Sequence, residues 1–204
     1  MELTGKPVST GIVMGEVLRY IPFTPVLAQA PLAEGAQAQA WEQYLAAKAQ
    51  AKAELDTLEQ RMAQTDPEKA KIMAAHEEIL ADPAMDDEIR LLVMEQLCSP
   101  DAAIAQIYDT YAAILAKSKN PIMRERASDL RDVKRRLLRC WANAPEQDLS
   151  SLPRPAIVVA DDLFPSDTAS LDRARVLGII TQVGGSTSHT AIIARSYEIP
   201  AVLG

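Results

Sequence analysis

Residues 176–204 read VLGIITQVGGSTSHTAIIARSYEIPAVLG, and this stretch decides the fold class of the chain. An apolar run leads into two glycines and three small hydroxyl residues, then an apolar helical pattern, and a second apolar run follows Pro200. That order predicts a strand, a tight turn, a helix and another strand. Strands that alternate with helices indicate an α/β layer with parallel pairing. Working outward, we expect strands at 12–20, 156–160, 176–181 and 201–203, and helices at 168–175 and 189–197.

The middle of the chain has a different composition. No glycine occurs between Gly35 and Gly178, and the residues between them are rich in Ala, Leu, Gln, Glu, Lys and Arg, which favour helix. Asp66-Pro67 is typical of a helix cap followed by a first helical position. Similar pairs at 82–83, 99–100 and 120–121 delimit further helices, so we expect helices at 37–64, 66–80, 82–97, 99–119 and 121–141. The predicted fold class is α/β plus all-α, with a helical bundle of residues 30–143 inserted into a discontinuous α/β domain of residues 1–29 and 144–204.

Composition excludes some classes of protein. The formal net charge is −7, which disfavours nucleic acid and suits a basic partner. No apolar run is long enough to cross a membrane, and the N-terminus lacks a signal-peptide pattern. Cys98 and Cys140 have no metal-ligand spacing, so they suit a reducing cytoplasm, and no metal site is expected in this chain.

His189 is the strongest candidate for chemistry. Gly184 and Gly185 permit a sharp turn, and a hydroxyl at Thr187 or Ser188 suits a helix N-cap, which places His189 in the first helical turn. Unpaired backbone N–H groups and the positive end of the helix dipole make such a position a favourable site for a phosphate. Neutral imidazole is also a nucleophile that needs no separate base. From spacing alone, however, a histidine in a first turn is more often a solvated or capping residue.

Five stretches resemble one known family. GGSTSHTAIIARSYEIPAVLG is similar to the phosphohistidine signature of phosphoenolpyruvate-utilising enzymes, and within them to Enzyme I of the bacterial sugar phosphotransferase system. The other stretches occur in the family's order, at residues 8–15 (VSTGIVMG), 75–82 (AHEEILAD), 124–132 (RERASDLRD) and 165–169 (PSDTA).

The resemblance implies roles for the residues around His189. His189 would be the phosphoryl carrier, bonded through Nε2, and Thr168 would hydrogen-bond it. Gly184, Gly185, Thr187 and Ser188 would line the phosphate pocket. Without the family, Thr168 would more often be a residue at the beginning of a helix. Ser186 departs from the family pattern, in which a basic residue is common, and this puts in doubt how tightly the phosphoryl group is held.

The resemblance also implies a partner. Helices that contain Glu68, His76, Asp82 and Arg126 would form the docking face for HPr, the small basic carrier protein. Periodicity alone makes His76 a polar core or helix-surface residue, and acids around position 82 would also complement a helix dipole. Both interpretations of the acids are compatible, because acidic residues beside Met73, Ile79 and Met85 would attract a basic partner and bury an apolar patch.

In the family, phosphoenolpyruvate and Mg²⁺ bind to a C-terminal barrel that this sequence does not contain. We therefore expect the chain to be part of a larger protein, with its α/β domain cut short, and to be monomeric. It should accept a phosphoryl group from phosphorylated HPr without using phosphoenolpyruvate by itself. Two alternatives stay open: an Enzyme I-like domain of a multiphosphoryl transfer protein or of a dihydroxyacetone kinase phosphotransferase subunit, and a non-catalytic module that senses HPr.

Overall fold

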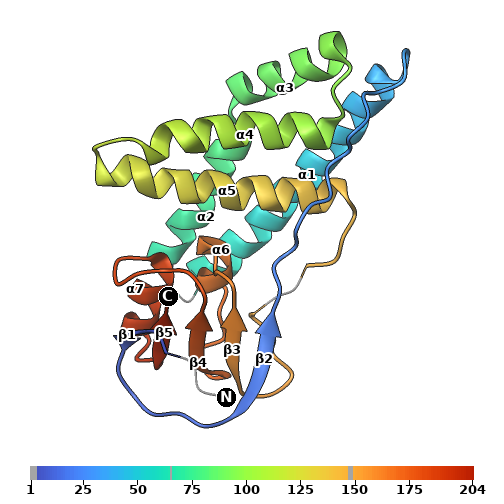
Figure 1. Cartoon of the computed structure of the whole chain (residues 1–204). Helices are drawn as coiled ribbons and strands as arrows, with labels where there is room; N and C mark the ends of the chain where they lie inside the picture. The colour runs from blue at the N-terminus through green and yellow to red at the C-terminus, as the bar shows by residue number, and fades with distance from the viewer. Residues whose placement is uncertain (1–3, 65, 147–148) are drawn as a thin grey trace. The chain divides into compact units, whose positions relative to one another are not determined.

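A computed structural model describes residues 4–64, 66–146 and 149–204 (Figure 1). The described residues form two compact units, one of residues 4–22 with 149–204 and one of residues 23–146. These boundaries lie seven and three residues from the predicted 29/30 and 143/144. The chain combines a mixed five-stranded sheet with helices, and the predicted fold class is confirmed. Among the described residues, no helix is both long and apolar enough to cross a membrane.

The helical unit contains five helices: α1 (Gln37–Ala63), α2 (Pro67–Leu80), α3 (Pro83–Gln96), α4 (Pro100–Ala116) and α5 (Pro121–Trp141). The last four begin with proline, as the sequence predicts, because proline has no N–H to leave unpaired at that position. Side chains of Asp66, Asp82 and Asn120 accept hydrogen bonds from the first turns of their helices. Each of these helices is therefore started by residues adjacent in sequence.

Two helix pairs, α1 with α2 and α4 with α5, make the most extensive contacts in the helical unit. The core contains large side chains from all five helices: Tyr44, Leu55, Met73, Ile89, Ile104, Tyr108 and Leu137. Polar bonds also join distant helices, since Tyr44 Oη on α1 donates to Asp86 Oδ1 on α3 at 2.6 Å.

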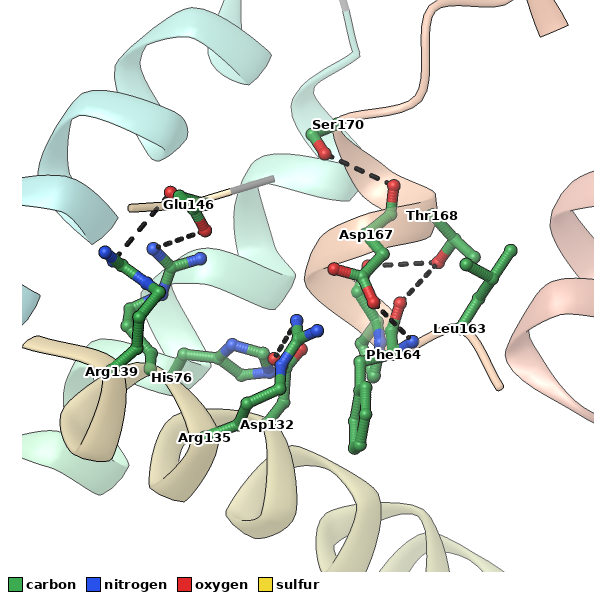
Figure 2. Close-up of polar contacts among 12 residues, drawn as sticks. His76, Asp132, Arg135, Arg139, Glu146, Leu163, Phe164, Asp167, Thr168 and Ser170 are labelled. Atoms are coloured by element: carbon green, nitrogen blue, oxygen red, sulfur yellow. Dashed lines mark hydrogen bonds and ion pairs between the residues drawn. The ribbon is translucent and has the colours of Figure 1, made fainter. Parts of the chain in front are cut away.

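An ionic cluster of two buried arginines, one half-buried carboxylate and one exposed carboxylate lies between α1 and the end of α5. Arg136 Nη1 is 2.9 Å from Glu54 Oε2 and 3.2 Å from Glu146 Oε1, and only 4% of the Arg136 side chain is exposed. Arg139 pairs with the same two carboxylates, and Figure 2 shows its contact with Glu146. Burial raises the pKa of the neighbouring Cys140 thiol to about 11. The cluster attaches Glu146, the last residue of the helical unit, to helix α5.

The sheet unit contains five strands: β1 (Lys6–Ser9), β2 (Glu16–Tyr20), β3 (Ala156–Ala160), β4 (Val176–Thr181) and β5 (Ala201–Leu203). Their order is β1-β5-β4-β3-β2. β2, β3, β4 and β5 are parallel, as predicted, whereas β1 is antiparallel to β5.

The single strand predicted at 12–20 is wrong in its first half. β1 and β2 lie on opposite edges of the sheet, so the segment between them crosses from one edge to the other. This segment packs closely against the beginning of β4. A Cβ on Gly178 of β4 would lie 2.9 Å from Val13 Cγ1, and a Cβ on Gly15 would lie 2.7 Å from Leu177 Cδ1. The apolar residues at 12–14 therefore belong to a crossing over the sheet and not to a strand.

The helix predicted at 168–175 is also wrong. The helix found there is α6 (Pro165–Ala169), which begins earlier because Pro165 suits the first helical position. After it, Asp172 Oδ1 accepts a hydrogen bond from Ala174 N–H at 2.9 Å and Asp172 O accepts one from Arg175 N–H, so residues 172–175 form a turn. The following helix, α7 (His189–Ser196), agrees with the prediction to one residue.

Residues of β3, β4, β5 and α7 pack into one apolar core, with members that include Val158, Ile179, Ala191, Ala194 and Leu203. α6 follows the carboxyl end of β3, and α7 follows that of β4. Because β3 and β4 are adjacent and parallel, their carboxyl ends lie side by side, and both connections leave from there. Open α/β sheets usually place their sites at the carboxyl ends of the strands.

Candidate functional site

The loop between β4 and α7 is held by hydrogen bonds at its beginning. Gln182 N–H and Val183 N–H donate to Ala160 O and Asp161 O, and Thr181 Oγ1 donates to Val183 O at 2.6 Å. These bonds fix the loop to the end of β3 before it reaches the two glycines.

Of the two glycines, only Gly184 is required by the backbone. Its φ is +127°, and a Cβ there would lie 3.3 Å from Leu203 Cδ1 and 3.5 Å from Thr181 Oγ1. A Cβ on Gly185 would meet nothing within 4 Å, and its φ lies outside the left-handed range. The sharp turn predicted at these glycines is therefore located at Gly184.

α7 begins at His189 and is capped by Ser188. Ser188 Oγ accepts a hydrogen bond from Ala191 N–H at 3.2 Å, so Ser188 is the N-cap residue and Thr187 is not. His189 is half-buried at the first helical position, as predicted. Within the described residues, no acceptor is bonded to the N–H groups of His189 and Thr190. These donors and the helix dipole make the beginning of α7 suited to an anion.

Thr168 lies in α6, which packs against α7. Its hydroxyl donates to Pro165 O at 3.0 Å and to Phe164 O at 3.3 Å (Figure 2). Thr190 Oγ1, on the residue after His189, donates to Leu163 O at 3.5 Å. The structure thus brings the helices of Thr168 and His189 together, with no hydrogen bond between these two described side chains. The orienting role of Thr168 stays a prediction.

Two residues that the sequence analysis does not identify support α6. Asp167 Oδ2 accepts from Phe164 N–H at 2.9 Å, and Asp167 Oδ1 accepts from Tyr20 Oη at 2.7 Å. An acid two positions after a helix-starting proline suggests a capping interaction. No sequence signal connects it to Tyr20, which lies 147 positions earlier.

Asp82 and Arg126, in the helical unit, line one pocket of about 330 Å³. The pocket is lined by residues of α2, α3, α4 and α5, and seven further residues complete its wall: Glu78, Ile79, Ala84, Met85, Tyr111, Leu115 and Leu130. Asp82 also caps α3, through a 2.9 Å bond from Ala84 N–H to its Oδ1. One acid and one arginine from the predicted set therefore lie beside apolar side chains in a hollow.

The other two predicted docking residues are not in this pocket. His76 is buried, with Nε2 3.5 Å from Asp129 Oδ1 and no hydrogen-bond partner for that nitrogen among the described residues. The side chain of Glu68 lies outside the described part of the chain, although its backbone belongs to α2. A docking role for either residue stays a prediction.

The sheet unit also has a cavity of about 510 Å³ near the carboxyl ends of its parallel strands. Arg19, Asp161 and Gln182 are among its lining residues, whereas His189 is not. Across the described residues, no group of three or more His, Cys, Asp or Glu side chains could hold a metal ion.

Two family models match the sequence. The N-terminal domain of PEP-utilising enzymes matches residues 4–126, and the mobile domain of PEP-utilising enzymes matches residues 152–204. The second match contains both His189 and Thr168, and the first contains Asp82 and Arg126.

Named relatives agree with these matches. A phosphoenolpyruvate-protein phosphotransferase of Bacillus sp. (strain S) is 34% identical over 201 residues, which are 98% of this chain and 34% of the relative. One from Mycoplasma capricolum is 39% identical over 137 residues, covering 67% of this chain and 24% of the relative. The chain thus spans about a quarter to a third of the length of these curated relatives.

Solved structures share the fold over the whole chain. A solution structure of an Enzyme I protein is 32% identical with a TM-score of 0.86, and the match covers 100% of this chain and 82% of that one. The N-terminal domain of a nitrogen Enzyme 1 is 25% identical with a TM-score of 0.64, covering 98% and 82%. The two family models, the relatives and the shared fold together show that this chain belongs to the PEP-utilising enzymes, as an N-terminal domain of the Enzyme I type.

Proposed function

We propose that this chain is the phosphoryl-carrying and HPr-docking part of a phosphoenolpyruvate-protein phosphotransferase. The observation that supports this most directly is the position of His189: a half-buried imidazole at the beginning of a helix, next to N–H groups that have no described acceptor. A phosphoryl group on this ring would lie at the positive end of the helix dipole.

The transfer exchanges one P–N bond for another. The lone pair of His189 Nε2 attacks phosphorus of the phosphorylated HPr histidine, the new P–N bond forms, and the bond to the HPr ring breaks. Nδ1 of His189 carries the ring proton throughout, so no separate base is needed. The reverse reaction delivers the phosphoryl group to HPr. In the whole protein, phosphoenolpyruvate would be the first donor, with Mg²⁺ bound outside these residues.

We assign Thr168 the role of orienting the His189 ring. Its hydroxyl donates its hydrogen to the Phe164 and Pro165 carbonyls, so its oxygen still has lone pairs with which to accept. A hydrogen bond accepted from the Nδ1–H of His189 would hold the proton at Nδ1 and leave Nε2 free to attack phosphorus. Gly184, Gly185, Thr187 and Ser188 would form the wall of the phosphate pocket, and Ser188 also caps the helix.

We assign HPr docking to the 330 Å³ pocket of the helical unit. Its walls combine charged Asp82, Glu78 and Arg126 with apolar Ile79 and Met85, a composition that suits a basic partner with an apolar contact. The net charge of −7 would speed association with a basic protein. Glu68 would complete the proposed face, whereas the buried His76 would support it from beneath, beside Asp129. We place the protein, as a monomer, in the cytoplasm.

The test is transfer from phosphorylated HPr, followed by intact mass at neutral pH. We expect one acid-labile phosphate on the parent chain and none on His189→Ala. Ser196→Ala is the matched control, because Ser196 is an exposed residue at the other end of the same helix, and this variant should still be phosphorylated.

The outcomes separate the competing functions. Binding of HPr without phosphate transfer would favour the non-catalytic sensing module over the carrier. Absence of HPr binding would remove the docking assignment. Phosphorylation of the chain leaves a standalone enzyme and a domain of a fused carrier equally possible, and the sequence on either side of this chain decides between them.

A further inference from the structure

One carboxylate, that of Asp167, makes two hydrogen bonds that support the short helix that contains Thr168. α6 has five residues, too few to be stable through its own hydrogen bonds. Its N-cap residue, Phe164, contributes no side-chain acceptor. Asp167 Oδ2 reaches back to Phe164 N–H at 2.9 Å and closes the first turn from inside the helix. The backbone position of Thr168, the next residue, depends on this turn.

The second oxygen of the same carboxylate bonds outside the helix. Tyr20 Oη donates to Asp167 Oδ1 at 2.7 Å, and both side chains are buried (Tyr20 is the last residue of β2). A short hydrogen bond to an ionised acceptor is among the stronger ones in proteins. Asp167 thus attaches α6 to the edge strand β2. This strand lies just before residue 22, where the first of the two segments of the sheet unit ends.

A further bond continues this connection to His189. Thr190 Oγ1 donates to Leu163 O at 3.5 Å, and α6 packs against α7. Leu163 immediately precedes the N-cap of α6, and Thr190 immediately follows His189. β2, α6 and the beginning of α7 are therefore joined in one chain of contacts, all within the sheet unit.

We propose that Tyr20 and Asp167 are positioning residues for phosphorylation of His189. Neither contacts the imidazole; together they hold α6 so that the Thr168 hydroxyl oxygen can accept from Nδ1–H of the His189 ring. Loss of the Tyr20 hydroxyl removes the hydrogen bond from β2 to Asp167 and loosens α6 against β2. This proposal rests on the proposed roles of His189 and Thr168.

Tyr20→Phe removes only the hydroxyl and is the main test. Tyr44→Phe is its matched control, because Tyr44 Oη makes a similarly short bond, 2.6 Å, to Asp86 in the helical unit. We expect transfer from saturating phosphorylated HPr to slow about tenfold in Tyr20→Phe alone, with an unchanged KM for HPr. The ¹⁵N chemical shifts of the His189 ring, which report its tautomer, should also change in Tyr20→Phe alone.

Asp167 supplies a rescue comparison. Asp167→Asn keeps an oxygen that can accept from Phe164 N–H, whereas Asp167→Ala keeps neither bond. We expect Asp167→Asn to retain more of the transfer rate than Asp167→Ala, at matched folded populations.

Unchanged transfer rates and unchanged ¹⁵N shifts in Tyr20→Phe would overturn the positioning role. If the parent chain accepts no phosphoryl group, the proposed function fails, and the ¹⁵N shifts then decide the positioning role by themselves. A shift that occurs equally in Tyr44→Phe would also count against it, because it would show a general loss of stability.

Discussion

The helical unit and the sheet unit place their candidate functional residues by opposite means. In the helical unit, Asp82 and Arg126 lie on helices whose starts are set by adjacent residues, such as the Asp82-Pro83 pair. In the sheet unit, Thr168 is supported by a hydrogen bond between residues 147 positions apart. The proposed docking face can therefore be assembled from locally specified helices, while the proposed phosphohistidine site depends on contacts that exist only after the sheet has formed.

The comparison has a consequence for mutations. A change in the helical unit should alter stability or partner affinity while His189 chemistry stays intact. A change at the ends of β3 and β4 should alter the chemistry and leave docking intact. Trp41 and Trp141 both belong to the helical unit, so tryptophan fluorescence reports the unfolding of that unit alone.

The largest expected effect on stability is at Arg136. Its side chain is 4% exposed and pairs with Glu54 and Glu146, which are 25% and 39% exposed, so Arg136→Ala removes buried packing and one of the two arginines that these carboxylates share. We expect the free energy of unfolding of the helical unit to fall by about 2.5 kcal/mol, measured by urea titration of tryptophan fluorescence. Hydrogen exchange of β3 and β4 amides should be unchanged.

The control for Arg136 is an exposed pair in the same unit. Lys52 Nζ lies 2.8 Å from Asp56 Oδ1, but the lysine side chain is 55% exposed. Lys52→Ala should cost less than about 0.5 kcal/mol. If Arg136→Ala destabilised β3 and β4 by as much as the helices, the two units would unfold as one, and the proposed independence would be wrong.

The second prediction concerns the glycine pair before His189. Gly184→Ala introduces a side chain at a φ of +127°, and it should cost the sheet unit about 2 kcal/mol and slow phosphoryl transfer. Gly185→Ala, which meets no atom within 4 Å, should change stability by less than about 0.5 kcal/mol. Hydrogen exchange of β4 amides measures the loss of stability in each variant. Equal losses in the two variants would contradict the assignment of the turn to Gly184.

The sequence predicts the helical unit better than the sheet unit, because adjacent residues set the helices whereas distant contacts set the sheet. Helix starts at 67, 83, 100 and 121 are predicted because proline and capping residues act on their own neighbours. The apolar residues at 12–14 are misassigned because their role is to cross the sheet, and no local pattern encodes that path. Local signals are sufficient for the bundle and insufficient for the order of strands.

The candidate site shows the same limit. An N-cap hydroxyl at Thr187 or Ser188 and His189 in the first turn follow from residue types at fixed spacing; the structure places the cap at Ser188 and confirms His189 in the first turn. The assignment of Thr168 depends on a family resemblance, since its own neighbours suggest only a helix start. Tyr20 gives no signal, because its contribution is one hydroxyl brought to Asp167 by the pairing of β2 with β3.

The third prediction tests docking. Arg126 lines the pocket of the helical unit, and Arg126→Ala should weaken HPr binding about tenfold, measured by calorimetry, without changing the number of phosphates that the chain accepts. Arg131 is an exposed arginine on the same helix and is not part of the pocket wall. Arg131→Ala should bind HPr normally, and an equal loss in both variants would reduce the effect to net charge.

The smallest expected effect is at Ser186, an exposed residue of the loop before α7. Ser186→Arg would add a positive charge near the proposed phosphoryl group, and exposed charge pairs contribute about 0.5 kcal/mol. The equilibrium with phosphorylated HPr should therefore shift toward phosphorylated His189 by about two- to threefold at low salt, with less shift as salt screens the pair. Ser196→Arg adds the same charge at the last residue of α7 and should leave the equilibrium unchanged. A shift of equal size in both variants would mean that the charge acts through the net charge of the protein, and that position 186 has no special relation to the phosphoryl group.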